Sequence, residues 1–74
     1  MKMDKPTAWQ LAKAFIEDGN ISYYEDSLDF TMTGTNYELY CYQCAANYIM
    51  PLEGKKTENG YFFHVNFKDI REVA

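Results

Sequence analysis

The chain of 74 residues has no lysine or arginine between Ala14 and Gly54, which is more than half of its length. Seven carboxylates lie in this gap, whereas the segments before and after it have net charges of +2 and +1. The formal net charge of the whole chain is −4. Proteins that bind nucleic-acid phosphates or anionic membranes need a basic patch. We therefore expect neither direct nucleic-acid binding nor membrane binding.

Long apolar runs are also missing from the sequence. No segment approaches the roughly 20 apolar residues that cross a bilayer. The N-terminus, from Met1 to Pro6, lacks the apolar region of a signal peptide. These features predict a cytoplasmic protein. In a reducing compartment its two cysteines, Cys41 and Cys44, are expected to be free thiols.

Sequence motifs for catalysis or metal binding are scarce. Cys41, Cys44 and His64 are the one candidate metal constellation, and they lack the second ligand pair that structural zinc sites usually show. If the cysteines lie on a strand, residues three apart point to opposite faces and cannot share a metal or a disulfide. The serines, Ser22 and Ser27, lie in no nucleophile elbow. We therefore expect no metal, no cofactor and no enzymatic activity.

Aromatic side chains are abundant, at 18% of the residues. A chain of this length buries only about 60% of the surface that it exposes when unfolded. Large rings fill a small core efficiently, because each can bury roughly 150–250 Å². No linker, repeat or low-complexity tract interrupts the sequence. The sequence predicts a single compact domain over residues 1–74.

The spacing of apolar residues predicts an amphipathic helix over residues 7–18. Asp4 or Thr7 is a suitable N-cap, and Gly19 followed by Asn20 is a suitable stop. The apolar stripe of this helix covers an arc of about 160°. It consists of Ala8, Trp9, Leu11, Ala12, Phe15 and Ile16.

After Gly19 the apolar period changes from about 3.6 residues to about 2, which is typical of strands. In the second predicted strand, Leu28, Phe30 and Met32 alternate with polar residues. A polar connection over residues 53–60 precedes the last strand. The predicted strands cover residues 21–26, 28–33, 37–43 and 61–67.

The segment from Tyr37 to Leu52 is compatible with two structures. As a strand, residues 37–43 would be the second arm of a hairpin whose turn is residues 33–36. As a helix, the apolar residues would spread around the whole axis and leave no clean stripe. The strand is therefore preferred for residues 37–43. A strand is also preferred for residues 44–52, but for these residues a helix remains the alternative.

These elements predict an α+β fold in which an N-terminal helix packs on a mostly antiparallel four-stranded sheet. The predicted core consists of Trp9, Leu11, Phe15, Leu28, Phe30, Leu39, Phe63, Val65 and Phe67. By alternation, the outer face of the sheet would be acidic and aromatic, and we interpret it as a partner-binding surface. Its predicted contact residues are Tyr24, Asp26, Asp29, Glu38, Tyr40 and Tyr42.

An acidic surface with exposed tyrosines suits a protein that acts by binding, because charge steers the encounter and tyrosine supplies contact area. In size, charge and lack of catalytic motifs, the chain resembles small acidic phage-encoded inhibitors of the anti-CRISPR or anti-restriction type. The resemblance implies a DNA mimic that blocks a basic surface of a bacterial protein or ribonucleoprotein complex. It also implies that the chain acts in the cytoplasm of the host cell.

Two other classes of protein stay open. One is a small accessory domain that binds a protein partner or itself, as a homodimer for example, with the acidity serving solubility. The other is a metal or redox protein, which would depend on Cys41 and Cys44 alone. A homodimer would associate through an apolar contact rather than an acidic one.

Overall fold

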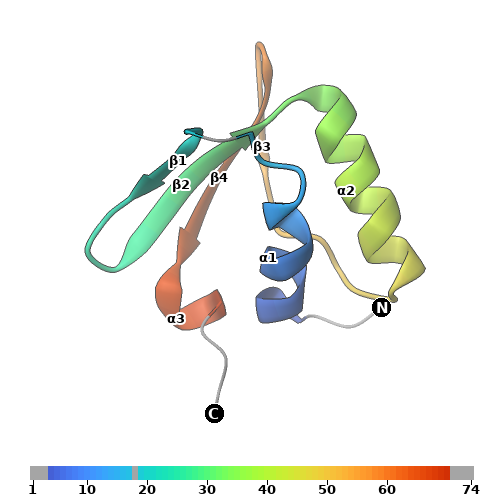
Figure 1. Ribbon diagram of the computed structural model, residues 1–74, viewed down its shortest axis with the longest axis horizontal. Helices are drawn as coiled ribbons and strands as arrows, with labels where there is room; N and C mark the ends of the chain where they lie inside the picture. Colours follow the sequence, from blue (N-terminus) through green and yellow to red (C-terminus); the bar gives the residue numbers. More distant parts are fainter. Residues whose placement is uncertain (1–3, 18, 71–74) are drawn as a thin grey trace.

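The computed structural model describes residues 4–17 and 19–70, which form helices and a four-stranded antiparallel sheet (Figure 1). The predicted α+β class, with an N-terminal helix, is confirmed. The helices and strands are α1 (Lys5–Lys13), β1 (Ile21–Tyr23), β2 (Ser27–Met32), α2 (Gly34–Ala46), β3 (Lys55–Thr57), β4 (Gly60–Asn66) and α3 (Phe67–Ile70).

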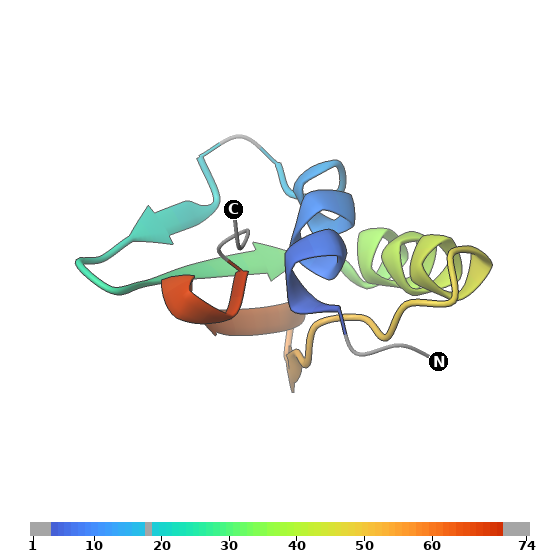
Figure 2. The ribbon, with the colours of Figure 1, turned by 90° about the horizontal axis from the view of Figure 1, so that it is seen from below.

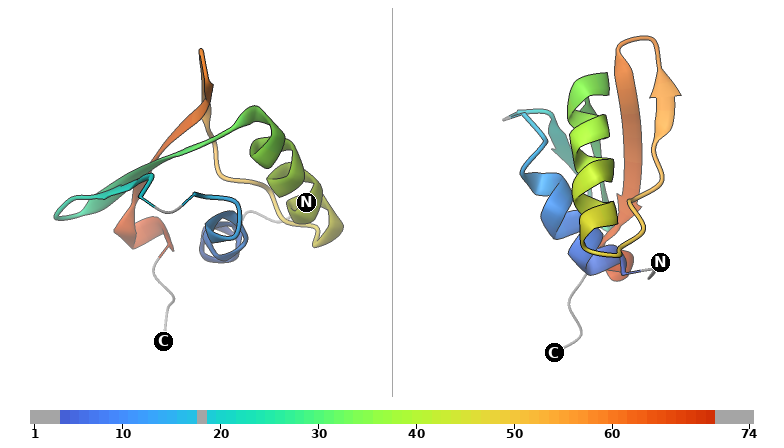
Figure 3. Two further views of the ribbon diagram at one scale, coloured as in Figure 1. Left: turned by 45° about the horizontal axis from the view of Figure 1, so that its top comes forward. Right: turned by 90° about the vertical axis from the view of Figure 1, so that its right-hand side faces the viewer.

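The sheet has the strand order β1-β2-β4-β3, so β2 and β4 form its centre and both of their neighbours are edge strands. Leu28 lies opposite Val65 and Phe30 lies opposite Phe63 across the central pair. Residues that face each other across two strands point to the same side of a sheet. These four buried side chains therefore define the inner face, on which α1 and α2 both lie (Figure 3).

Aromatic rings hold the helices against this inner face. Phe30 and Phe63 are stacked with their ring centroids 4.6 Å apart. Trp9 of α1 contacts Phe30 at 5.5 Å, and Tyr37 of α2 contacts Phe63 at 5.9 Å. The two helices thus meet the sheet at adjoining rings of one core, as the abundance of aromatic residues predicts.

Most of the predicted core is confirmed, since Trp9, Leu28, Phe30, Phe63 and Val65 are buried. Three further predicted members pack against the core but are only partly buried: Leu11, Phe15 and Phe67. The prediction was wrong for one residue, because the side chain of Leu39 is 52% exposed.

Helix α1 begins two residues before the predicted range of 7–18, because Asp4 rather than Thr7 is its N-cap, and it also ends earlier. The Oδ1 atom of Asp4 accepts a hydrogen bond from the Thr7 amide at 3.1 Å, so Asp4 is the N-cap. The helix ends at Lys13 rather than at residue 18, and a tighter turn follows, in which the Phe15 amide donates to the carbonyl of Ala12. Gly19, with φ of +87°, lies in the loop beyond this turn. The tight turn keeps Phe15 against the core without further helix.

Helix α3 lies beside α1 at one end of the sheet (Figure 2). The Lys5 Nζ atom is 3.5 Å from the Asp69 carboxylate, which joins the two helices at the surface. The chain enters α3 directly from β4, and the Phe67 amide donates to the Asp26 carbonyl at 3.0 Å. This bond also ties the β1–β2 turn to the end of the sheet.

The segment predicted as a strand over residues 37–43 is part of α2, so the predicted hairpin is wrong. Thr33, which we placed in the turn, is the N-cap, and its Oγ1 accepts from the Asn36 amide at 3.1 Å. Residues 44–46 continue the helix, which corrects the strand predicted over residues 44–52. Alternation misled the prediction because tyrosine occurs on both the buried and the exposed side of α2.

The fourth strand comes instead from the segment predicted to be a polar connection. Strand β3 pairs with β4 through a tight turn that ends at Gly60, whose φ is +151°. A Cβ atom at Gly60 would collide with the Met32 carbonyl oxygen, so glycine is required at this position. The exposed lysines of β3 lie at the sheet edge, where unpaired backbone groups are commonly protected by charge.

Candidate binding surface

Two of the predicted contact residues, Tyr24 and Asp26, lie in the turn between β1 and β2. The Tyr24 amide donates to the Ser27 carbonyl at 2.8 Å, which closes the turn. Tyr23 and Tyr24 are 67% and 54% exposed, and Glu25 and Asp26 are exposed beside them. We call residues 23–26 the acidic turn. It lies at the opposite side of the molecule from α2 (Figure 1).

Asp29 lies on the outer face of the sheet, as predicted, but it has a local partner. It is opposite His64 on β4, and its Oδ1 atom is within hydrogen-bond distance of His64 Nδ1. The neighbouring outward positions on β2 and β4 are Thr31 and Phe62. Asp29 is thus the single acidic side chain on the described strands, and the prediction of an acidic outer sheet face was wrong.

Glu38 and Tyr42 lie on α2 rather than on the sheet, one helical turn apart on its solvent side. Tyr42 is 81% exposed. The six predicted residues therefore do not form one surface. The acidic turn holds two of them, the outer sheet face one, and α2 the remaining three.

Tyr40 is not a contact residue, because its side chain is completely buried. Its hydroxyl donates to the Ala8 carbonyl at 3.1 Å and accepts from the Leu52 amide at 2.8 Å. Burial raises the pKa of Tyr40 above the usual range of a phenol. Tyr40 is therefore a structural residue that joins α1, α2 and the segment after α2.

The cysteines lie on one side of α2, one turn apart, rather than on opposite faces of a strand. Cys44 is buried next to Tyr40, and this burial raises the pKa of its thiol. Cys41 is partly buried at the edge of a groove. In the part of the chain that the structure describes, no three His, Cys, Asp or Glu side chains come together as metal ligands.

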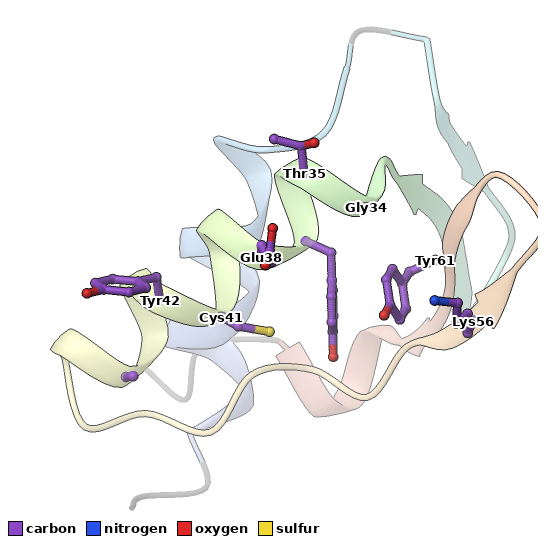
Figure 4. Close-up of a pocket in the computed structure, with 9 residues that line it drawn as sticks. Gly34, Thr35, Glu38, Cys41, Tyr42, Lys56 and Tyr61 are labelled. Carbon is purple, nitrogen blue, oxygen red and sulfur yellow. The ribbon is translucent and has the colours of Figure 1, made fainter.

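A groove with a volume of about 790 Å³ separates α2 from the β3–β4 hairpin (Figure 4). Tyr37 and Tyr61 are stacked in it with centroids 3.8 Å apart. The Lys56 Nζ atom lies 5.8 Å from the Tyr61 ring centre, and Glu38 is on the helix wall. Tyr42 points away from Tyr61 at the far end of the groove.

Burial, with a hydrogen bond to Cys41, raises the pKa of Tyr37 to about 12. Its phenol is therefore protonated at neutral pH, and it contributes area and a hydroxyl rather than a nucleophile. Glu38 and Lys56 are the charged groups that line the groove. The groove therefore combines two stacked phenol rings with one charge of each sign.

Five of the six described carboxylates in the lysine-free and arginine-free region are exposed. Among the described carboxylates between residues 17 and 53, Asp29 alone has a cationic or titratable basic group within 4 Å. Lys13 and Lys56 lie over aromatic rings instead. The exposed and unpaired carboxylates are Glu17, Glu25, Asp26, Glu38 and Glu53.

Four large exposed side chains were missed by the sequence analysis. Tyr23 belongs to the acidic turn, whereas Leu39, Tyr48 and Met50 lie on α2 or directly after it. One signal could have revealed the helix and thus these residues. Pro51 follows a run with Ala45 and Ala46, and proline is common shortly after a helix ends.

Comparison with protein-family models, curated proteins and solved structures finds no match for this chain. Among the described helices, none is both long enough and apolar enough to pass through a bilayer.

Proposed function

We propose that this chain is a non-enzymatic, acidic protein-binding domain that acts in the cytoplasm. Its partner is a basic, nucleic-acid-binding surface of a bacterial protein or ribonucleoprotein complex, which the chain blocks as a phage-encoded inhibitor of the anti-CRISPR type. One observation carries this proposal. Five exposed carboxylates lie in a region without lysine or arginine, and none has a cationic partner within 4 Å.

Unpaired surface carboxylates act differently from surface ion pairs. Charges of both signs cancel over short distances, whereas charges of one sign add to a field that attracts a basic surface and accelerates association. Two of the acidic sites also have an exposed tyrosine next to them. Tyr24 directly precedes Glu25 in the acidic turn, and Tyr42 is one turn from Glu38 on α2.

The structure changes the list of contact residues on which this proposal rests. Tyr24, Asp26, Glu38 and Tyr42 are exposed and stay in it, and Glu25 joins them. Asp29 contributes less, because His64 holds its carboxylate. Tyr40 is withdrawn, since no partner can reach it.

The test is a charge reversal at the exposed carboxylates that have a tyrosine beside them. In the variant Glu25→Lys, Asp26→Lys and Glu38→Lys, each reversal adds two charges, so the net charge changes from −4 to +2. The matched control reverses Glu17, Glu53 and Glu58, which are also exposed, and reaches the same net charge. Exposed substitutions usually change stability by only about 0.5 kcal/mol each, so both variants should fold.

The measurement is retention of bacterial lysate proteins on the immobilised chain, followed by elution with salt and mass spectrometry. The wild type should retain nucleic-acid-binding proteins that elute as salt rises, and DNA should compete with the chain for the isolated partner. The first variant should lose them, while the control keeps part of the binding. Equal retention by wild type and the first variant would contradict the proposal.

A plaque assay separates the inhibitor from a general acidic binder. Expression of the chain in bacteria with an active CRISPR or restriction system should restore plating of a targeted phage. The charge-reversed variant should not restore it. Retained lysate partners without any rescue of plating would leave an acidic binding domain and exclude the inhibitor function in the systems tested.

A further inference from the structure

Four large apolar or aromatic side chains are exposed on the solvent side of α2 and in the residues directly after it. Leu39 and Tyr42 are 52% and 81% exposed on the helix, and Tyr48 and Met50 are 79% and 48% exposed after it. We call these four residues the α2 patch. It borders the groove at Tyr42, which lines the far end of the groove, although the Tyr42 ring points away from Tyr61 (Figure 4).

The α2 patch is nearly free of charge. Glu38 is the single charged residue of the helix, and no basic residue lies in its last turn. Leu39, Tyr42 and Ala46 are spaced by three, four and seven residues, which aligns them along one side of a helix. Protein interfaces are enriched in tyrosine and methionine and depleted of charge at their centre.

Tyr48 adds an independent observation, because its backbone is in the left-handed region with φ of +56°. Its amide donates to the Ala45 carbonyl at 3.1 Å, and the Ile49 amide donates to the Cys44 carbonyl at 2.9 Å. Glycine is the usual residue at this position of a helix end. A large side chain that is exposed in this conformation is uncommon, and such strain is found at functional sites.

We propose that the α2 patch is the contact surface for a second copy of this chain, in a two-fold symmetric dimer with the two α2 helices antiparallel. A two-fold axis near Tyr42 would place Leu39 against Ala46 of the partner subunit, a large side chain against a small one. The contact uses the same residues on both copies, as two-fold symmetry requires. The antiparallel arrangement also opposes the two helix dipoles favourably.

Charge does not prevent this association, although each copy is acidic. In the antiparallel pair the two Glu38 residues are offset by about nine positions along the helices, which is roughly 13 Å. This offset exceeds the screening length of about 8 Å at physiological ionic strength. The acidic turn lies at the other side of each molecule and stays outside the contact (Figure 1).

The exposed area is large enough to matter in a dimer. At about four-fifths exposure, Tyr42 and Tyr48 together offer roughly 240–400 Å². With Leu39 and Met50 the patch reaches about 300–600 Å², the size of the largest apolar patch on a typical monomer, which is often functional. The flanking polar side chains would bring the contact toward the roughly 800 Å² per partner of a standard interface.

The experiment is sedimentation velocity of the full chain over a wide concentration range. The wild type should show a monomer–dimer equilibrium in the micromolar range, and its melting temperature should rise with concentration. The variant Leu39→Glu with Tyr42→Glu should be monomeric, because it places four carboxylates at the axis. Circular dichroism checks that this variant keeps its helices, as the exposure of both residues predicts.

The matched control is Tyr23→Glu with Tyr24→Glu, which changes charge equally in the acidic turn and should dimerise like the wild type. A wild type that stays monomeric up to about 1 mM would overturn the proposal. A dimer that survives in the α2 variant would overturn it as well. A monomeric wild type whose lysate partner is lost in the α2 variant would assign the patch to another protein and also exclude the dimer. The dimer would bury Tyr42, which the proposed acidic partner surface also uses, so in the dimer that surface would consist of the acidic turn and Glu38. The charge-reversal variants leave Tyr42 unchanged and therefore test the acidic surface separately.

Discussion

The two sides of α2 show the same residue type in opposite roles. Tyr40 is completely buried and Tyr42 is 81% exposed, although the two are separated by a single residue. The hydroxyl of Tyr40 bonds to backbone groups of Ala8 and Leu52, which are distant in sequence. Side-chain chemistry alone therefore does not tell whether a tyrosine in this chain stabilises the fold or is available for binding. The position of each tyrosine around the axis of α2 decides whether that tyrosine is buried or exposed.

The largest expected effect is the difference in stability between a variant on the buried side of α2 and a variant on its exposed side. Tyr40→Ala should lower the free energy of unfolding by about 3–5 kcal/mol, since it leaves a cavity and an unpaired Leu52 amide. That is most of the stability of a domain of this size. Tyr42→Ala should change it by no more than about 0.5 kcal/mol. Urea denaturation of the two variants, followed by circular dichroism, measures the difference.

A dimer through the α2 patch would add a concentration dependence to the Tyr42→Ala result, so both variants are best compared at the lowest practical concentration. Similar losses in the two variants would contradict the assignment of inward and outward sides. In that case α2 would be rotated differently about its own axis, or its residues 37–43 would form the strand that alternation predicts.

A smaller expected effect is the loss of stability at high pH, when Tyr37 of α2 ionises. The pKa of Tyr37 is raised from 10.0 to about 12, so the folded protein holds this proton more tightly than the unfolded chain. The resulting stability is fully present below about pH 10 and is lost as pH rises toward about 12. Tyr40 shifts in the same direction, which adds to the loss.

Melting temperatures measured from about pH 9 to about pH 12 test this expectation. The wild type should melt at progressively lower temperature across that range. Tyr37→Phe should show a shallower decrease, because its ring keeps the stacking on Tyr61 and has no proton to lose. Identical slopes for the two proteins would show that Tyr37 is not the group that titrates.

The smallest expected effect is a gain in stability from a substitution at Tyr48, directly after the end of α2. Tyr48→Gly should raise the free energy of unfolding by about 1 kcal/mol, since glycine adopts the left-handed conformation without a Cβ penalty. If Tyr48 contributes to the α2 patch, the same variant should weaken dimerisation. Tyr48→Ala is the matched control, because it removes the ring and keeps the strain. A loss of stability in Tyr48→Gly would show that the ring makes stabilising contacts within the chain.

Local signals were sufficient for much of the fold. The spacing of Trp9 and its apolar neighbours predicted α1, and Asp4 caps it as expected. Alternation predicted β1, β2 and β4 to within a few residues, because one face of each meets the core. The α+β class followed from these elements. The end of α1 could not be predicted, since a turn that packs Phe15 on the core replaces the last helical residues.

The candidate site was predicted less well than the fold, because it depends on α2. A strand over residues 37–43 placed Tyr40 beside Tyr42 on one face, whereas the helix separates them. The sequence correctly identified Tyr24, Asp26, Glu38 and Tyr42 as exposed. It could not show that Asp29 would meet His64, because that pairing depends on the register of β2 against β4.

The sequence by itself determined the charge distribution, the abundance of aromatic rings and the positions where glycine or a capping residue is needed. These properties are local, and no packing changes them. Only the tertiary structure decided that residues 34–46 are helical and which of their tyrosines is buried. The physical reason is that this segment has apolar residues all around its axis. Burial of Tyr40 and Cys44 against the core selects one rotation of the helix and leaves Leu39 and Tyr42 in water.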